Sequence, residues 1–412
     1  EGREIVGLDA GLDDDLADLL DGLRAFLRAE VMPRHEADPA LADPRTMFGA
    51  DGRFRDDVLH QIRAVRRAAA DAGYYTMLAP PELGGGGVGF EGLFRAWELI
   101  YEECGPHHFL GYWALAHWAR GPSRVLLELD AAEREQVLPD LLSGEHSMCF
   151  AMSEPDAGSD AWAMRTTATR AGDGWVINGT KQWITNGPYA EHTLVFAVTD
   201  ADAARAHRGG ISAFLIDADA PGYRVDSVIA MFGHAGGDEA ILSFDDVFVP
   251  DRRRVGALGD GMRIAMSGVS SGRLYNTARS VGLARWALAQ AFGHTEQRQA
   301  FGRKIIEFQG ISHRLATAAI ELRAARLLGL DCAKRLDAGA SGRSDLAAAK
   351  VFATEMAARA IDTAVQAHGA MGFTNEMGLA EAWQQVRRIQ VADGSAEVLR
   401  NQVVKSIRAG EW

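Results

Sequence analysis

The sequence predicts an α+β fold in which helical domains precede and follow a β domain. Residues 8 to 147 carry apolar residues at helical spacing, and residues 147 to 250 carry short β-like runs between Gly, Asp and Pro turns. Long alanine-rich segments follow, as is typical of helices that pack closely. We therefore predict an N-terminal helical domain over 1–147, a middle β domain over 148–255 and a C-terminal four-helix bundle over 256–412.

The N-terminal domain begins with apolar residues at helical spacing from Leu12 to Leu27, which predict a first helix. The run Val31-Met32-Pro33 predicts the end of that helix, because proline interrupts helical hydrogen bonding. Further helices are expected at 58–72, 90–103, 111–129 and 131–142.

The middle domain contains four β-like runs, which predict an antiparallel barrel or sandwich. These runs are Val176–Ile177, Thr193–Val198, Ile211–Ile216 and Ala240–Phe244. The Asn178-Gly179 pair predicts a hairpin turn, followed by a second strand that carries Trp183 and Thr185.

The C-terminal domain is predicted to be long-helical, with segments at 264–291, 295–303, 311–338, 344–369, 376–388 and 394–408. Four long helices in succession indicate a bundle, which also offers a surface for oligomerisation.

Charge and cysteine content limit the classes of function. The 43 basic and 56 acidic residues give a net charge of −13, which argues against a nucleic-acid partner. Cys104, Cys149 and Cys332 are widely spaced, and neither they nor the scattered histidines form a metal-ligand set, so no metal site is expected. The odd cysteine number favours a reducing cytoplasm. With neither a run of 18 apolar residues nor a signal-peptide pattern, we expect a soluble cytoplasmic protein.

One stretch, Phe150–Asp160, stands out as a candidate ligand site. It begins as an apolar strand and breaks at Pro155 and Gly158 into a turn of small polar residues. Its serines and backbone N–H groups could meet a polar ligand at the end of a strand. The strand that carries Trp183 and Thr185 could face the same flat ligand.

Six motifs, in order along the chain, resemble those of the acyl-CoA dehydrogenase family. They are Leu138–Glu145, Met152–Asp160, Ile177–Gly187, Asp246–Pro250, Arg298–Gly302 and Gln366–Gly372. The resemblance extends from Pro81 to Ser395 and implies the acyl-CoA dehydrogenase fold with FAD as cofactor.

The resemblance assigns the residues around the flavin ring by position. Phe150, Met152 and Ser153 would line the flavin, with Ser153 on its pyrimidine side. Trp183 would pack near the ring, and Thr185 would donate a hydrogen bond to flavin N5. Taken singly, such aromatic and polar residues are more often core and strand residues than ligand contacts.

The remaining cofactor contacts are assigned to the C-terminal domain. Arg298 and Phe301 resemble the family's contacts to the FAD pyrophosphate and adenine, although a solvated charge is the plainer interpretation of Arg298. Further contacts, some from a neighbouring subunit, are implied for Gln366, Gly369, Ser395 and Glu397.

The catalytic base is expected in the run Val391-Ala392-Asp393-Gly394-Ser395. The family usually has Tyr-Glu-Gly-Thr here, so Asp393 stands at the base position and Ala392 replaces the Tyr. The family's alternative position for a glutamate is Gly272, which leaves Asp393 as the candidate. One methylene fewer withdraws the carboxylate by about 1 Å, a displacement that can lower a rate by about a hundredfold.

Other interpretations of Asp393 remain open. A branch of the family that keeps Asp here, and nitroalkane oxidase, which shares the fold, both support a base. Arg400 could orient or acidify it. Alternatively, Asp-Gly-Ser before a helical run is a good N-cap signal for the following helix.

The substrate contacts are also implied by resemblance. Ser159 would hold the pantetheine arm, and Arg273 and Gly394 would lie at the substrate, with the backbone around Gly394 polarising the thioester carbonyl. The family's Asp before Arg273 is Ser270, and its Arg-Asp pair upstream of the base reads Gln384-Gln385. Because Ala392 replaces a tyrosine, we expect room for a bulky, long or branched acyl group.

The sequence thus predicts FAD-dependent α,β-dehydrogenation of an acyl-CoA thioester to the trans-2-enoyl thioester, as in fatty acid metabolism. An electron-transfer flavoprotein would accept the electrons, and the enzyme would be a homotetramer or homodimer. Two alternatives remain. One is an oxidase or biosynthetic enzyme on the same fold, acting on a nitroalkane or a carrier-protein thioester. The other is a non-catalytic relative.

Overall fold

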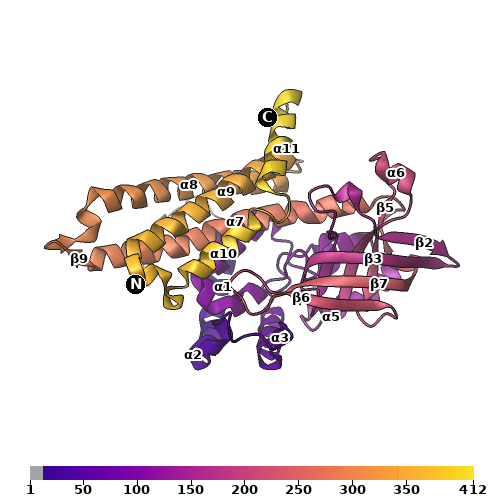
Figure 1. The fold of residues 1–412 in the computed structure, drawn as a ribbon, viewed down its shortest axis with the longest axis horizontal. Coiled ribbons are helices and arrows are strands. Elements are labelled where there is room, and N and C mark those ends of the chain that lie inside the picture. Colours follow the sequence, from indigo (N-terminus) through magenta and orange to yellow (C-terminus); the bar gives the residue numbers. More distant parts are fainter. Residues whose placement is uncertain (1–12, 341) are drawn as a thin grey trace. The chain divides into compact units, whose positions relative to one another are not determined.

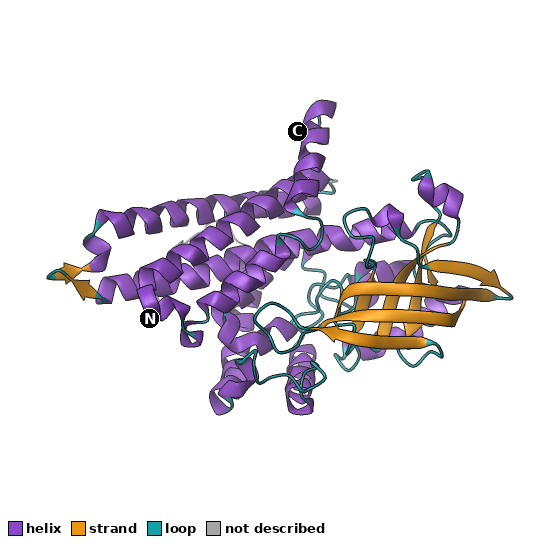
Figure 2. Cartoon of the chain, viewed as in Figure 1, coloured by secondary structure: helices purple, strands orange, loops and turns teal. Residues whose placement is uncertain are grey.

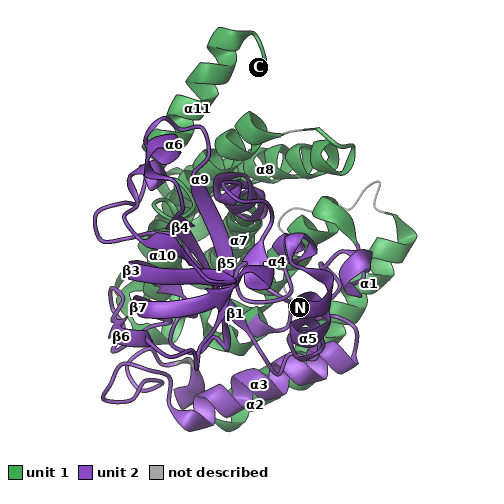
Figure 3. Ribbon diagram, turned by 90° about the vertical axis from the view of Figure 1, so that its right-hand side faces the viewer, with its two compact units in different colours: residues 1–38, 88–112, 272–412 green, residues 39–87, 113–271 purple. Residues whose placement is uncertain are grey.

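The structure is a computed structural model that describes residues 13–340 and 342–412 (Figure 1). It contains two compact units, which Figure 3 colours separately. Unit 1 comprises residues 1–38, 88–112 and 272–412, and unit 2 comprises residues 39–87 and 113–271. Helices precede and follow the strands along the chain, as the sequence predicts, and Figure 2 distinguishes helices from strands by colour.

The first helices of unit 1 are α1 (Asp14–Phe26), α2 (Met32–Ala37) and α4 (Gly89–Cys104). The predicted start at Leu12 lies outside the described residues. The predicted end at Pro33 is wrong, because a π-helical turn over Leu27–Val31 continues directly into α2. Pro33 lies in the first turn of α2, a position at which proline is tolerated.

The later helices of unit 1 form the predicted C-terminal set. They are α7 (Gly261–Gln297), which begins in unit 2, α8 (Gln309–Asp337), α9 (Arg343–His368), α10 (Leu379–Ile389) and α11 (Ala396–Ala409). The separate helix predicted at 295–303 is wrong. Instead α7 is followed by a hairpin of β9 (Gln299–Ala300) and β10 (Arg303–Lys304). Phe301 and Gly302 both have positive φ, which reverses the chain between these strands.

Unit 2 contains α3 (Asp56–Asp71), α5 (Ala131–Leu142) and α6 (Ala201–Arg205). The helix predicted at 111–129 is wrong, because this segment contains only 3₁₀ turns at Pro106–Trp113 and Arg124–Glu128. Gly121-Pro122 lies between the two turns, and proline disfavours a helical conformation at the residue before it.

The strands of unit 2 form an eight-stranded sheet, in the order β6-β7-β3-β2-β4-β5-β8 with β1 beside β4. They are β1 (Met148–Ala151), β2 (Thr167–Ala171), β3 (Gly174–Thr185), β4 (His192–Val198), β5 (Ile211–Asp217), β6 (Tyr223–Ile229), β7 (Glu239–Pro250) and β8 (Arg254–Val255). Most pairs are antiparallel, as predicted, but β1 runs parallel to β4 with Met148 opposite His192. Because the two strands are parallel, their C-terminal ends meet at one edge of the sheet.

The hairpin predicted at Asn178-Gly179 is wrong, because β3 is one continuous strand across this pair. Gly179 has a φ of 150°, and the register between β3 and β7 shifts there, as at a β-bulge. Asn178 is held against β7, since its amide nitrogen donates to Asp246 Oδ1 at 2.9 Å and its amide oxygen accepts from the Asp246 N–H at 2.8 Å. The partner strand β7 therefore keeps an Asn-Gly pair extended.

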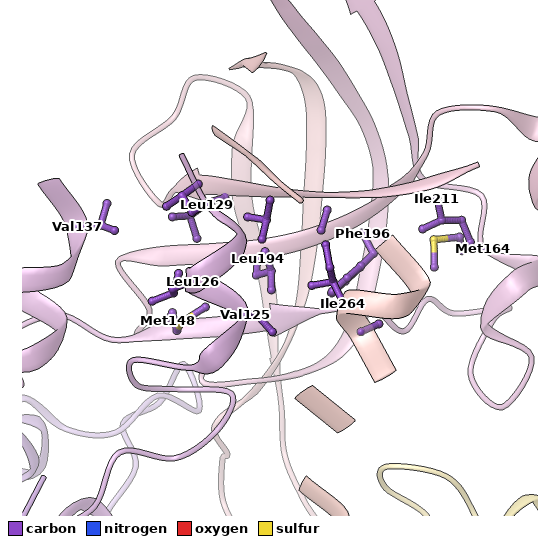
Figure 4. Close-up of a cluster of buried hydrophobic side chains, with 14 of the residues drawn as sticks. Val125, Leu126, Leu129, Val137, Met148, Met164, Leu194, Phe196, Ile211 and Ile264 are labelled. Carbon is purple, nitrogen blue, oxygen red and sulfur yellow. The ribbon is translucent and has the colours of Figure 1, made fainter. Parts of the chain in front are cut away.

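The core of unit 2 covers both faces of β4. Leu194 and Phe196 belong to the cluster in Figure 4, whereas Val195 and Ala197 belong to a second cluster. Successive side chains of a strand point to opposite faces, so β4 is apolar throughout. This buried strand pairs with β1, whose C-terminal end carries the candidate site.

Candidate active site

The end of β1 places Phe150 among aromatic rings. Its ring lies 5.2 Å from that of Trp118 and 4.7 Å from that of Phe196, measured between centroids. The chain leaves the sheet at Met152 and Ser153, both of which are partly exposed. A ligand at this strand end would therefore contact backbone and side chains that the core positions.

A buried ion pair joins the loop after β1 to strand β3. Lys181 Nζ donates to the Met152 carbonyl at 3.0 Å and to Glu154 Oε1 at 2.9 Å. The Gln182 N–H donates to the Ser153 carbonyl at 2.9 Å. Burial lowers the pKa of Lys181 to about 8, although Glu154 opposes this shift. These contacts bring the two strand ends together, so that Ser153 lies beside the segment that carries Trp183.

Trp183 combines backbone strain with exposure. Its φ is 66°, in the left-handed region that non-glycine residues rarely adopt, and it lies at the register shift between Lys181 and Ile184. Its side chain is large and apolar, yet 54% of the residue is exposed. An exposed indole of this kind is suited to pack against a flat ligand. Thr185, two residues on, is partly exposed, and Ser159 lies on the exposed turn after β1.

In unit 1, four of the predicted cofactor residues lie at one end of the helices. Arg298 directly follows α7, and Phe301, which is 96% exposed, forms the tip of the β9–β10 hairpin. Gln366 and Gly369 lie at the end of α9 and are exposed. The rings of His294 in α7 and His368 in α9 stack with centroids 4.5 Å apart, which holds these two helix ends together.

The other two predicted cofactor residues, Ser395 and Glu397, lie at the start of α11. The turn before α11 contacts α9 at Lys350, 16 residues before Gln366. At 1.5 Å per residue, this corresponds to about 24 Å along the helix. The structure of one chain thus separates these six residues into two groups, one at each end of α9.

The turn that carries Asp393 is held by residues from two helices. Asp393 has a φ of 54°, so its backbone, like that of Trp183, lies in the left-handed region. Arg273 Nε of α7 donates to the Asp393 carbonyl at 3.1 Å, and Asn276 Nδ2 donates to the carboxylate oxygen Oδ2 at 2.7 Å. Lys350 Nζ of α9 donates to the Gly394 carbonyl at 2.6 Å and also to the Ala392 carbonyl.

Burial and the neighbouring charges shift the pKa of Asp393 in opposite directions. Burial raises the pKa of Asp393, whereas Lys350, Arg273 and the Asn276 hydrogen bond favour the carboxylate form. Burial lowers the pKa of Lys350 to about 8, although Asp393 opposes this shift. A raised pKa makes the carboxylate a stronger base, and the two cations favour the ionised form that can accept a proton.

Comparison with known proteins decides the family. The model of the acyl-CoA dehydrogenase C-terminal domain matches residues 259–408, and that of the middle domain matches residues 149–247. Mitochondrial isovaleryl-CoA dehydrogenase of Oryza sativa subsp. japonica is 34% identical over 88% of this chain and 86% of that protein. The chain belongs to the acyl-CoA dehydrogenase family.

Further relatives agree with this assignment. Human mitochondrial short-chain specific acyl-CoA dehydrogenase is 34% identical over 80% of this chain and 78% of that protein. The structure of butyryl-CoA dehydrogenase from Megasphaera elsdenii covers 97% of this chain and 100% of its own, with a TM-score of 0.82 and 26% identity. Acyl-CoA dehydrogenases are FAD-dependent, and this chain is a flavin-dependent oxidoreductase that acts on CH–CH bonds.

The structure answers two questions that the motifs of this acyl-CoA dehydrogenase leave open. The N-cap interpretation of Asp393 is wrong, because the cap of α11 is Ser395, whose Oγ accepts from the Val398 N–H at 3.4 Å. Arg400 does not orient Asp393, since its guanidinium pairs with Glu355 at 2.8 Å on the surface. The cations at Asp393 are Lys350 and Arg273.

Sequence reasoning missed Asn276 and Lys350. Asn276 lies three residues after Arg273 in α7, one helical turn on, so it shares a helix face with a predicted site residue. Lys350 lies on the apolar face of α9 between Ala347 and Val351, where a buried lysine is unusual. A charged residue on a periodic apolar face was the signal that could have found it.

Two further expectations concern the whole chain. Within residues 13–340 and 342–412, no helix is long and apolar enough to cross a membrane. The same residues contain no group of three or more His, Cys, Asp or Glu placed to hold a metal ion. Cys104, Cys149 and Cys332 are buried free thiols.

Proposed function

We propose that this acyl-CoA dehydrogenase removes hydrogen from the α and β carbons of an acyl-CoA thioester, with Asp393 as the base that takes the α proton. The observation that carries this proposal is the arrangement of the Asp393 turn. Its three consecutive carbonyls, from Ala392 to Gly394, accept hydrogen bonds from Lys350 and Arg273. Its carboxylate is oriented through one oxygen by Asn276.

The turn also offers donors for the thioester carbonyl. Among the described residues, neither the Asp393 N–H nor the Gly394 N–H donates to a protein acceptor. A thioester carbonyl that accepted from them would gain negative charge at its oxygen as the α proton leaves, and N–H donors stabilise such charge. The turn would thus supply both the base, through Asp393, and the electrophilic assistance, through its backbone.

The residues of unit 2 support a flavin site. Trp183 would cover the flavin ring, Ser153 and Thr185 would donate hydrogen bonds to its polar edge, and Phe150 and Met152 would line it. FAD, when bound, accepts the hydride that leaves the β carbon. Gln366 lies about 24 Å along α9 from Lys350, which contacts the Asp393 turn, and Arg298, Phe301 and Gly369 belong to the same group as Gln366. This separation supports the proposal that one group of FAD contacts comes from a second copy in a homodimer or homotetramer.

The acyl group is proposed to be bulky, long or branched. Ala392 is exposed, and it replaces the tyrosine that is usual beside the base. Relatives named for isovaleryl-CoA and for short-chain substrates are equally similar, at 34% identity, so identity does not select the chain length. A substrate panel with a preference for four-carbon thioesters would contradict this part of the proposal.

The partners and the compartment are also proposals. We propose that an electron-transfer flavoprotein accepts the electrons, and that Ser159 and Arg273 lie along the thioester. The three buried free thiols support a reducing cytoplasm.

The test is anaerobic titration of the FAD-loaded protein with acyl-CoAs of different chain length, followed by the flavin absorbance. We expect bleaching in the wild type, and a loss of about a thousandfold in its rate in Asp393→Asn, which keeps the Asn276 contact but removes the base. Bleaching at an unchanged rate in Asp393→Asn would remove Asp393 from the mechanism. Oxygen consumption during turnover would instead identify an oxidase, and a protein that binds no flavin would be a non-catalytic relative.

A further inference from the structure

We infer that Lys350 is a positioning residue for this reaction, because its ammonium group fixes the turn that aims the Asp393 carboxylate. The inference rests on the proposed function, in which Asp393 is the base. Lys350 does not itself touch the carboxylate in the structure. It acts through the backbone on either side of Asp393.

The hydrogen bonds of Lys350 span the base. Nζ donates to the carbonyls of Ala392 and Gly394, which are the two neighbours of Asp393 in the chain. Arg273 takes the carbonyl between them. With all three carbonyls turned toward cations, the turn has one orientation, which helps to hold Asp393 at a φ of 54°. A residue in the left-handed region persists where its surroundings determine it in this way.

The burial of Lys350 argues that it is retained for more than packing. Lys350 is 1% exposed. Its neighbours Ala347 and Val351 pack against Ala396 and Leu399 of α11 in one apolar cluster. An apolar side chain would fill this position without the desolvation cost of an ammonium group, which is several kcal/mol in general. The desolvation cost is offset here by hydrogen bonds to two carbonyls, and both carbonyls belong to the turn that carries Asp393.

Lys350 bonds to the backbone and not to the Asp393 carboxylate, and this has a chemical consequence. Asn276 occupies Oδ2, and in the described part of the chain no side chain donates to Oδ1. A lysine bonded directly to the carboxylate would compete with the substrate proton for its lone pairs. From the backbone, Lys350 can favour the ionised form through space and leave Oδ1 open.

The charges that face Asp393 come from two elements. They are Lys350 from α9 and Arg273 from α7, and α11 contributes the uncharged Gln402, which accepts from Arg273 Nη1 at 3.2 Å. Loss of the Lys350 charge makes the carboxylate less favourable, so the pKa of Asp393 rises. Because the base must be ionised to accept a proton, the acid limb of the pH profile then moves to higher pH.

The experiment compares Lys350→Met, which removes donors and charge, with Lys350→Gln, which removes the charge and keeps an amide donor. The matched control is Thr354→Val, one turn further along the buried face of α9. The rate of anaerobic flavin reduction by acyl-CoA is measured against pH. The affinity for a thioester that cannot be oxidised is measured by equilibrium titration.

For Lys350→Met we expect a reduction rate about a hundredfold lower, as for a base displaced by about 1 Å, with ligand affinity within about twofold. Its acid limb should move up by about one pH unit. Lys350→Gln should show the same shift of the limb with a smaller loss of rate. If both variants keep the wild-type pH profile and lose no more rate than Thr354→Val, Lys350 is merely structural.

Infrared titration of the Asp393 carboxyl, assigned with Asp393→Asn, provides a measurement without turnover. It should show the carboxyl ionising at higher pH in Lys350→Gln than in the wild type. If no acyl-CoA bleaches the wild-type flavin, the proposed function has failed. The infrared titration still tests the coupling of Lys350 to Asp393, and an unchanged carboxyl titration would overturn it. If Lys350→Met does not fold, Lys350→Gln can still be compared with the wild type and with Thr354→Val.

Discussion

Trp183 and Asp393 are both non-glycine residues whose backbone lies in the left-handed region, with φ values of 66° and 54°. Trp183 lies in β3, next to Lys181 and Gln182, which contact the loop after β1. Asp393 lies in a turn that is held by Arg273, 120 residues away in the chain, and by Lys350, which lies 42 residues before Ala392. The first site is built within one sheet, whereas the second depends on the packing of α7 and α9.

The two sites also differ in what they leave open. Trp183 combines a positive φ with an exposed indole, which we propose is covered by a ligand. At Asp393, Lys350 and Arg273 take the backbone carbonyls of the turn, and Asn276 takes the carboxylate oxygen Oδ2. We propose that the positive φ at Trp183 serves ligand binding, and that the positive φ at Asp393 serves orientation of its carboxylate. Four experiments test this difference.

Lys181→Met should have the largest effect, because it leaves Glu154 buried without its ammonium partner. We expect a loss of about 3 to 5 kcal/mol in the free energy of unfolding, measured with urea. Lys181→Met combined with Glu154→Gln should recover a substantial part of this loss. A single variant as stable as the wild type would show that the ion pair does not hold the two strand ends.

Asp393→Glu tests whether the turn is adapted to the shorter side chain. The extra methylene displaces the carboxylate by about 1 Å, so we expect flavin reduction to be about a hundredfold slower. Binding of an acyl-CoA that cannot be oxidised should change little. A variant faster than the wild type would mean that the cations do not compensate for the shorter arm.

Trp183→Ala and Trp183→Gly separate binding from strain. Both lose the indole, and we expect FAD affinity to fall about tenfold in each, which corresponds to about 1.4 kcal/mol. Glycine adopts positive φ freely, so Trp183→Gly should be more stable than Trp183→Ala by about 1 kcal/mol in the FAD-free protein. Equal thermal stabilities of the two variants would argue against strain at this position.

Arg400→Ala should have the smallest effect. It removes an exposed ion pair with Glu355, which is worth at most about 1 kcal/mol. Flavin reduction and its pH profile should stay within about twofold of the wild type, since other cations face Asp393. A shifted acid limb in Arg400→Ala would indicate that Arg400 influences the pKa of Asp393, and it would argue against the role proposed for Lys350.

Much of the fold could be predicted because its signals are local. The long helices from α7 to α11 follow from helical spacing and alanine content, and β4 and β5 follow from β-like runs. The errors occur where the tertiary structure overrides a local signal. Asn178-Gly179 predicts a turn, but pairing with β7 keeps it in a strand. Pro33 predicts a helix end, but a π turn lets the chain continue.

The sequence by itself determined the family, the strand end at Phe150–Asp160 and the presence of an aspartate at the proposed base position. These features depend on residue types in short runs, which the sequence displays directly. Only the tertiary structure decided that Lys350 and Arg273, and not Arg400, hold the Asp393 turn, and that Ser395 is the cap. The physical reason is that a buried cation must find carbonyl partners, and which carbonyls lie within reach depends on how α7, α9 and α11 pack.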